Sequence, residues 1–423
     1  MTGSTTSPKE SQTPVGSAGE VFVAFLKLGL TSFGGPIAHL GYFRNELVQR
    51  RKWIDEKGYA DLLALTQFLP GPASSQMGFA LGLLCGGPLG AFAAWAAFTL
   101  PSAILLTLFA FGAAAFDGPV GSGIIAGLKI TAVAIVAQAV WGMARNLCPD
   151  RERATIALGA ALIVVLFADM FAQVAAISIG AAAGLLLCRS HQKAIDSHIA
   201  FPVSRKFGVA SLALFFVLLF ALPIATVASS SQGLAVFDTF YRAGSLVFGG
   251  GHVVLPLLET EVVRNGWVSQ DQFLAGYGAA QAVPGPLFTF AAYLGAVLGP
   301  EPTGLTGASI ALIAIFLPGF LILLGVIPLW DSFRNRESAQ ALMRGANAAV
   351  VGILGAALYD PVFTSGITGP HAFALALTCF VLLMAWKGTA LDRRACRGGG
   401  WGRDRTGALS RGEAGASLSR ISC

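Results

Sequence analysis

Long runs of apolar residues without any charge dominate this chain. Residues 62–116 contain no Asp, Glu, Lys, Arg or His. A helix in a soluble domain averages about 11–12 residues, whereas a bilayer crossing needs about 20 apolar ones. Residues 207–237 lack the alternating polarity of membrane β-strands, which run for about ten residues each. The pattern therefore predicts an all-α, polytopic helical membrane protein.

Composition and charge narrow the class further. The 423 residues are 55% hydrophobic and only 12% charged, against about 25% charged in a soluble domain. Soluble enzymes, nucleic-acid-binding proteins and disordered scaffolds are therefore disfavoured. The net charge of +6 lies largely in short loops and in the tail after Trp386, where positive charge holds a loop in the cytoplasm. We expect the lipid bilayer as a partner and no nucleic acid.

The chain contains two copies of one pattern, over residues 25–141 and 240–359. The matched positions are Lys27 with Arg242, Gly29 with Gly244, Phe33-Gly34-Gly35 with Phe248-Gly249-Gly250, Glu46 with Glu261, Trp53 with Trp267, Gln67 with Gln281, Pro70-Gly71-Pro72 with Pro284-Gly285-Pro286, and Leu100-Pro101 with Leu317-Pro318. One shared triplet could arise by chance, but an ordered series at a nearly constant offset indicates an internal repeat.

Charge placement predicts that the copies are inverted. The loop 44–57 holds five Lys or Arg residues, and its counterpart 259–271 holds one. Later in the repeat the bias reverses, because 116–129 is almost uncharged and 331–344 carries several arginines. Since positive loops stay in the cytoplasm, equivalent loops should lie on opposite sides of the membrane.

Segment counting leads to the same orientation. Three apolar segments between the copies, 154–168, 170–188 and 207–228, would turn the second copy over. The loops that flank 59–84 should both be cytoplasmic, so this stretch must cross the membrane an even number of times. The same holds for 273–299 from the other side. Re-entrant hairpins broken at the Pro-Gly-Pro motifs would satisfy this requirement. We predict about ten to thirteen membrane segments, some of them broken or re-entrant.

The same boundaries define the expected organisation of the chain. We predict a disordered N-terminus (1–19), a first repeat (20–150), connecting transmembrane segments with a cytoplasmic loop (151–235), a second repeat (236–388) and a disordered basic tail (389–423).

The paired motifs supply candidate transport residues. Pro70-Gly71-Pro72 and Pro284-Gly285-Pro286 cannot continue a helix, and backbone groups freed within a bilayer need polar partners. Gln67 and Gln281 lie one turn earlier. The alternative is an ordinary proline kink. The glycines Gly34, Gly35, Gly249 and Gly250 could expose helix N-terminal amides to an oxyanion, or could serve close helix packing.

The ionisable residues of the repeat form the second candidate set. Lys27 and Arg242 lie in apolar stretches and could bracket a divalent anion, whereas the alternative is snorkelling toward the membrane surface. Glu46 and Glu261 are candidates for proton coupling; the alternative is salt bridges with Arg50 or Arg264.

Histidine and cysteine do not form metal motifs in the sequence. His39 and His252 do not align with each other, which favours polar lining over a metal site. The cysteines are scattered singly, without metal-ligand spacing. We expect no metal and no cofactor.

Both copies resemble the chromate ion transporter family, whose domains show a Gly-Gly motif, a Trp soon after it and a downstream Pro-Gly-Pro. The first copy has 32–36 (SFGGP), Trp53 and 69–72 (LPGP); the second has 247–251 (VFGGG), Trp267 and 283–286 (VPGP). The resemblance covers about 25–145 and 240–388. It implies chromate export across the bacterial inner membrane, driven by membrane potential or a proton gradient, and hence chromate resistance.

We therefore expect an inverted-repeat carrier for chromate with a cytoplasmic C-terminus, compatible with a homo-oligomer. Sulfate has the same charge and shape, so uptake or exchange of sulfate or another tetrahedral oxyanion stays open. A membrane-embedded chromate reductase is the rival from another class. Such an enzyme would need a redox centre, and the sequence has no dinucleotide fingerprint, haem motif or cysteine cluster.

The inverted arrangement makes a prediction about labelling. Single cysteines replacing Gln49 and Ser269, in a variant without native cysteines, should differ in their reaction with an impermeant thiol reagent added outside. We expect labelling at 269 and none at 49, because the first loop is the basic one. Equal labelling at both positions would rule out the inversion.

Overall fold

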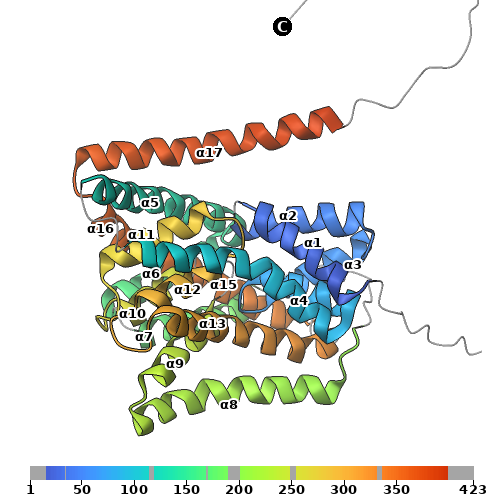
Figure 1. Ribbon diagram of the computed structural model, residues 1–423. Helices are drawn as coiled ribbons and strands as arrows, with labels where there is room; N and C mark the ends of the chain where they lie inside the picture. Colours follow the sequence, from blue (N-terminus) through green and yellow to red (C-terminus); the bar gives the residue numbers. More distant parts are fainter. Residues whose placement is uncertain are drawn as a thin grey trace, which may run out of the picture. The chain divides into compact units, whose positions relative to one another are not determined.

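The computed structural model describes residues 16–33, 35–113, 119–167, 170–188, 201–247, 254–330 and 336–398, and no strand occurs in these ranges. The helices in chain order are α1 (Ala18–Thr31), α2 (Gly35–Phe43), η1 (Arg44–Arg50), α3 (Glu56–Phe68), α4 (Ala73–Ala113), α5 (Pro119–Leu147), α6 (Arg151–Phe167), α7 (Met170–Leu187), α8 (Arg205–Ser229), α9 (Gln232–Leu246), α10 (Val254–Val262), α11 (Gln270–Ala282), η3 (Leu287–Thr289), α12 (Phe290–Val297), α13 (Gly304–Val326), η4 (Ile327–Leu329), α15 (Glu337–Ala357), η5 (Leu358–Phe363), α16 (Thr364–Gly366) and α17 (Pro370–Gly398) (Figure 1).

The chain divides into two units, Met1–Phe380 and Val381–Cys423, and the first contains most of the helices. Its helices include candidate membrane spans at Ala73–Gly112, Lys129–Leu147, Arg205–Ser229, Gly304–Leu329 and Glu337–Gly366. These spans confirm the predicted polytopic helical membrane protein.

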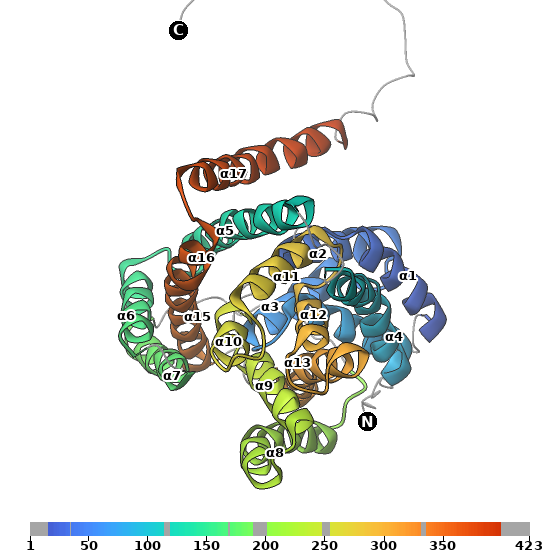
Figure 2. The ribbon, with the colours of Figure 1, turned by 60° about the vertical axis from the view of Figure 1, so that its left-hand side comes forward.

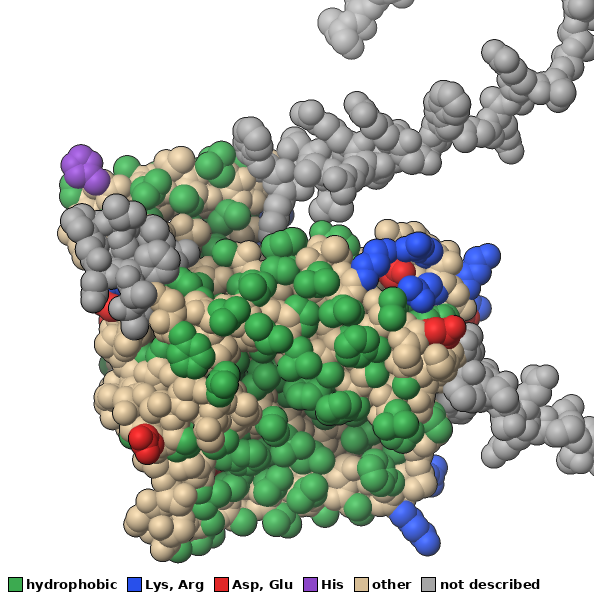
Figure 3. Space-filling model, in the orientation of Figure 1, with side chains coloured by type: hydrophobic (Ala, Val, Ile, Leu, Met, Phe, Trp, Pro, Cys, Tyr) green, Lys and Arg blue, Asp and Glu red, His purple; other side chains and the backbone are tan. Residues whose placement is uncertain are grey.

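The surface of this unit suits a lipid environment. Large apolar side chains along α8 are strongly exposed, and Val227 reaches 85%. Figure 3 shows hydrophobic side chains over most of one face, with Lys and Arg gathered at one edge near α2 and α3. In water such a patch would favour aggregation, whereas a bilayer solvates it.

The long helix α4 consists of two helices joined by a tight turn. Gly86 and Gly87 leave the helical region, with φ of −129° and +63°. A Cβ built on Gly82 would collide with the backbone carbonyl of Gly90, and the reverse holds as well. Residues eight apart in one helix would be separated by about 12 Å, so the segments before and after the turn form a hairpin.

The second half has the same hairpin between α12 and α13. Gly295 and Gly307 contact each other through their backbones there, as Gly82 and Gly90 do in the first half. Glycine is needed at these positions because any side chain would push the two helices apart.

Both Pro-Gly-Pro motifs break a helix, as predicted. The first break lies between the end of α3 and the start of α4, and the second between α11 and η3. Tyr293 on α12 donates its hydroxyl to the Gln272 carbonyl on α11 at 3.1 Å, and the Gly299 amide bonds the Trp267 carbonyl at 2.7 Å. The chain therefore enters on α11 and returns beside its starting point on α12.

The first half turns back in the same way. The Gly16 amide bonds the Cys85 carbonyl at 3.2 Å, so the segment before α1 lies at the far end of the first α4 helix. A side chain at Gly16 would also meet the Trp53 indole, which lies just before α3. The stretch from Trp53 to Cys85 therefore forms a hairpin with its ends together and its break at the tip.

The connecting helices pack on the second half through small residues. Figure 2 shows α6 and α7 beside α15, where Gly180 and Gly184 contact the Gly345 backbone. On another side α8 lies against α13, and Gly208 approaches Pro328.

The ends of the chain differ from the expected disorder where they are described. Ser17 caps α1 through a capping box, so helix begins at Ala18 rather than after Gly19. Helix α17 extends to Gly398, ten residues into the predicted disordered tail, over a stretch that includes the helix-forming residues Ala390, Leu391 and Arg393. The remaining tail residues lie outside the described ranges.

Candidate functional site

The two Pro-Gly-Pro breaks each bond the opposite half of the chain. The Gly71 amide donates to the Val247 carbonyl at 2.6 Å, and the Gly285 amide donates to the Ser32 carbonyl at 3.0 Å. Ser32 and Val247 are the C-cap residues of α1 and α9, and each directly precedes a Phe-Gly-Gly motif. We call the group Ser32, Gly71, Val247 and Gly285 the tip junction.

Only glycine fits the centre of each break. Gly71 and Gly285 have φ values of +117° and +110°, which other residues rarely adopt. A Cβ on Gly71 would lie 3.0 Å from the Gly319 Cα, and one on Gly285 would lie 2.8 Å from Ser102 Oγ. Ser102 and Gly319 each follow the matched Leu-Pro pair, so both sides of the junction are built from equivalent positions.

Gln76 holds the first break together, and the sequence reasoning did not select it. Its fully buried side chain donates from Nε2 to the Pro70 carbonyl at 2.8 Å and to the Gly319 carbonyl at 2.9 Å. The carbonyl freed by the break is thus satisfied by a side chain. The available signal was an amide within the charge-free run 62–116, where Gln67 and Gln76 are the two glutamines; the repeat places Phe290 at the position equivalent to Gln76.

Helix α4 begins at Ala73, directly after the first break, so its N-terminus lies at the tip junction. The first amides of a helix have no intrahelical acceptor and carry a partial positive charge. Such an end, next to an apolar bundle, can stabilise an oxyanion by hydrogen bonds without a charged side chain.

Each matched cation pairs with the matched acid of its own half. Lys27 Nζ lies 3.1 Å from Glu46 Oε2, and Arg242 lies 3.4 Å from Glu261 Oε2, with the partners 19 residues apart in both cases. The charges of Lys27 and Arg242 are therefore compensated by carboxylates in this structure.

The first ion pair belongs to a cluster with excess positive charge. Glu46 also accepts hydrogen bonds from Arg50 at 3.1 Å and from Arg51 at 2.9 Å, so the predicted contact with Arg50 is present. Burial would raise the pKa of Glu46, but the hydrogen bonds from Arg51, Lys27 and Arg50 hold it at about 2. This carboxylate stays ionised at every physiological pH.

The second ion pair has the opposite balance. Arg242 also bonds Asp238 at 3.0 Å, so one guanidinium serves two carboxylates. Burial raises the pKa of Glu261, and the attraction of Arg242 opposes only part of this rise. The alternative partner Arg264 makes no hydrogen bond or ion pair with Glu261 in the described part of the chain; its charge acts on Glu259. Glu261 can therefore take up a proton far more readily than Glu46.

The other candidates are placed less closely around the junction. Gln67 is exposed, whereas Gln281 is half-buried and hydrogen-bonded to Tyr277. Gly35 begins α2 with a φ of +78°. The candidate residues Gly34, Gly249 and Gly250 lie outside the described residues.

Histidine provides no metal site among the residues that the structure describes, where no group of three His, Cys, Asp or Glu side chains could hold a metal ion. His252 lies outside these residues. His39 is buried, and burial lowers its pKa to about 4 although the neighbouring Ser32 backbone opposes the shift, so its imidazole is neutral at physiological pH.

The chain is similar in sequence to known transport proteins. A family model described as "Chromate transporter" matches residues 19–188 and 234–391. A chromate transport protein of Pseudomonas aeruginosa is 29% identical over 389 residues, covering 89% of this chain and 90% of that protein. A chromate transport protein of Cupriavidus metallidurans is 27% identical, covering 87% and 88%. An uncharacterised transporter of Methanocaldococcus jannaschii is 29% identical, covering 80% and 83%. No solved structure matches the chain.

The cluster around Glu46 makes a prediction about stability. Replacing Glu46 with Gln removes a buried anion from three cations and should destabilise the protein by about 1–3 kcal/mol, the range for hydrogen bonds to charged groups. Because the pKa is depressed, the stabilisation should persist above the ordinary carboxyl pKa and disappear only as pH falls toward 2. Thermal unfolding of the purified protein in detergent measures the loss.

The matched control is Glu56→Gln. Glu56 bonds Arg44 at 2.8 Å, but both side chains are about half exposed, so the loss should stay below about 1 kcal/mol. Equal losses in the two variants would contradict a special role for the Glu46 cluster.

Proposed function

The chain belongs to the chromate transporter family, and we propose that it is a secondary transporter that exports chromate across the bacterial inner membrane and thereby confers chromate resistance. The observation that carries this proposal is the tip junction, where broken helices of both halves meet inside an apolar bundle. Uptake or exchange of sulfate by the same site is the alternative, because sulfate shares the charge and shape of chromate.

The matched contacts of the two halves support a rocking mechanism. Each half has a hairpin closed by a pair of glycines. The central glycine of each Pro-Gly-Pro motif donates a hydrogen bond to the residue just before the Phe-Gly-Gly motif of the other half. If the halves are inverted copies, the substrate site lies between them, near the middle of the membrane. Moving one half against the other would open the junction first to one side and then to the other.

The ion pairs suggest how transport is coupled to protons. If Lys27 and Arg242 hold a divalent anion, the anion must displace Glu46 or Glu261 from its cation. Displaced from Arg242, Glu261 would be a buried carboxylate next to Asp238 and would take up a proton, whereas Glu46 keeps further arginine partners. We therefore assign the coupling role to Glu261 rather than to Glu46.

The role of the junction is tested by replacing Pro70, Gly71 and Pro72 with three alanines. This change permits a continuous helix and removes the Gly71–Val247 bond, so chromate flux into vesicles of known orientation should fall to near background at equal protein abundance. The control is Pro223→Ala in α8, a proline inside a continuous helix, which should leave flux nearly unchanged. Full flux in the triple variant would show that the break does not serve transport. Parallel measurement of sulfate flux distinguishes the two substrates.

The coupling role predicts a specific effect of Glu261→Gln. The variant should still carry chromate, but its flux should lose most of the stimulation by an imposed proton gradient. Glu301→Gln, at an exposed glutamate, should keep the stimulation. A Glu261→Gln protein whose flux responds to the gradient like the unmodified protein would exclude Glu261 as the coupling group.

A further inference from the structure

We propose that neutral hydrogen-bond donors of the first half, the hydroxyls of Ser32 and Thr99 and the imidazole of His39, bind the oxygens of the transported oxyanion beside the Gly285 side of the tip junction. The second half supplies an apolar wall at the equivalent positions. This inference rests on the proposed function and names the groups that recognise the substrate.

These three side chains are buried polar groups that keep unsatisfied hydrogen-bonding atoms. Ser32 and Thr99 are fully buried and His39 is 1% exposed. Among the described residues, Ser32 Oγ and Thr99 Oγ1 have no hydrogen-bond partner. The His39 imidazole faces the Ser32 backbone, which leaves at least one of its two ring nitrogens without a partner in this part of the chain. Burying a polar group without a hydrogen-bond partner destabilises a protein, so a cluster of such groups points to a ligand that binds there.

Other hydroxyls of this fold show that the lack of partners is not general. Thr107, two turns after Thr99 on α4, donates to the Ala103 carbonyl at 2.8 Å. Ser245 on α9 donates to the Tyr241 carbonyl at 2.7 Å. Helical Thr and Ser commonly satisfy their hydroxyls on the preceding turn in this way. Thr99 has the same option on the same helix and does not use it.

A chain of short contacts brings the three donors to one place. The Ser32 carbonyl accepts from the Gly285 amide at 3.0 Å, and Ser102 Oγ, next to Gly285, donates to the Thr99 carbonyl at 3.1 Å. The His39 ring lies 5.4 Å from the ring of Phe98, the residue before Thr99. The residues that carry the donors, at the end of α1, on α2 and on α4, thus lie close to one Pro-Gly-Pro break.

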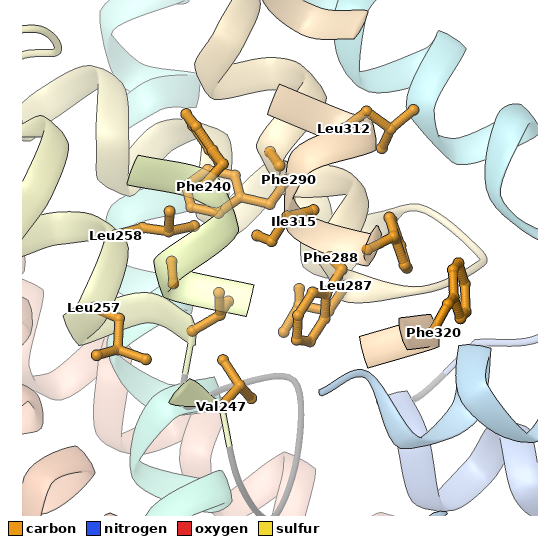
Figure 4. Close-up of a cluster of buried hydrophobic side chains, with 14 of the residues drawn as sticks. Phe240, Val247, Leu257, Leu258, Leu287, Phe288, Phe290, Leu312, Ile315 and Phe320 are labelled. Atoms are coloured by element: carbon orange, nitrogen blue, oxygen red, sulfur yellow. The ribbon is translucent and has the colours of Figure 1, made fainter. Parts of the chain in front are cut away.

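The second half has no donors at the equivalent positions. The repeat aligns Ser32 with Val247, His39 with Val254 and Thr99 with Phe316, and all three counterparts are buried and apolar. Figure 4 shows the surroundings of Val247, where Leu287, Phe288, Phe290 and Phe320 form part of a hydrophobic cluster. The sequence repeat is symmetric in its backbone motifs but not in its hydrogen-bonding side chains.

Neutral donors suit a carried dianion. They provide directed hydrogen bonds to the oxygens of a tetrahedral ion. A transport site must bind its ion firmly enough for entry and weakly enough for release. Hydroxyl and neutral imidazole groups meet this requirement better than an unpaired guanidinium.

The test combines transport with equilibrium binding of an oxyanion panel (chromate, sulfate and molybdate) to the purified full-length protein. Thr99→Val and Ser32→Ala each remove one donor with little change in size, and each should raise the half-saturating concentration about tenfold. Thr99→Ser keeps the hydroxyl and should stay within about threefold of the unmodified protein. The matched controls Thr107→Val and Ser245→Ala remove hydroxyls that bond the backbone, so they should leave half-saturation unchanged at equal abundance.

The outcomes separate this inference from the proposed function. Chromate transport with unchanged half-saturation in Thr99→Val and Ser32→Ala would overturn the donor site and leave the function standing. Binding of sulfate but not chromate, weakened by the same variants, would overturn the chromate function and support the site. If none of the three oxyanions binds the unmodified protein, both are wrong.

Discussion

The structure depends on the need to satisfy backbone groups where a helix is broken inside an apolar bundle. A proline motif leaves carbonyls and amides without intrahelical partners, and lipid offers none. The chain meets this need by crossing its halves, since the Gly71 and Gly285 amides bond carbonyls of the opposite half. In each half a glycine pair holds the helix after the break close to the helix that follows it.

The two halves share a backbone plan and differ in chemistry. Matched residues form an ion pair in each half, yet the first cluster has three cations for one carboxylate and the second has two carboxylates for one cation. A similar divergence separates the polar surroundings of Ser32 from the apolar surroundings of Val247. The two halves therefore differ in the charges and in the hydrogen-bonding groups that they carry at matched positions.

Periodicity and repeats predicted the membrane class, the two breaks and the contact of Glu46 with Arg50, but not the Lys27–Glu46 ion pair. These features are local or recur at a fixed offset, so a sequence displays them. The crossed bonds at the tip junction could not be predicted in this way, because residue spacing does not reveal which half satisfies a freed amide. Gln76 and Thr99 could not be selected from the sequence for a related reason. A polar residue in an apolar run can have many roles, and only its hydrogen-bond partners, or the lack of them, tell these roles apart. The break in α4 at Gly86-Gly87 was hidden by the uninterrupted apolar run around it.

The crossed bonds also bear on how the protein is made. Synthesis proceeds from the N-terminus, and domains generally fold as units in that order. Here the first half emerges with Ser32 and Gly71 exposed, and their partners Gly285 and Val247 do not exist until the second half has been translated. The first half must therefore remain without these two hydrogen bonds until the second half has been inserted. Contacts between such distant parts of a chain form slowly, so completion of the carrier is a late step of its biogenesis.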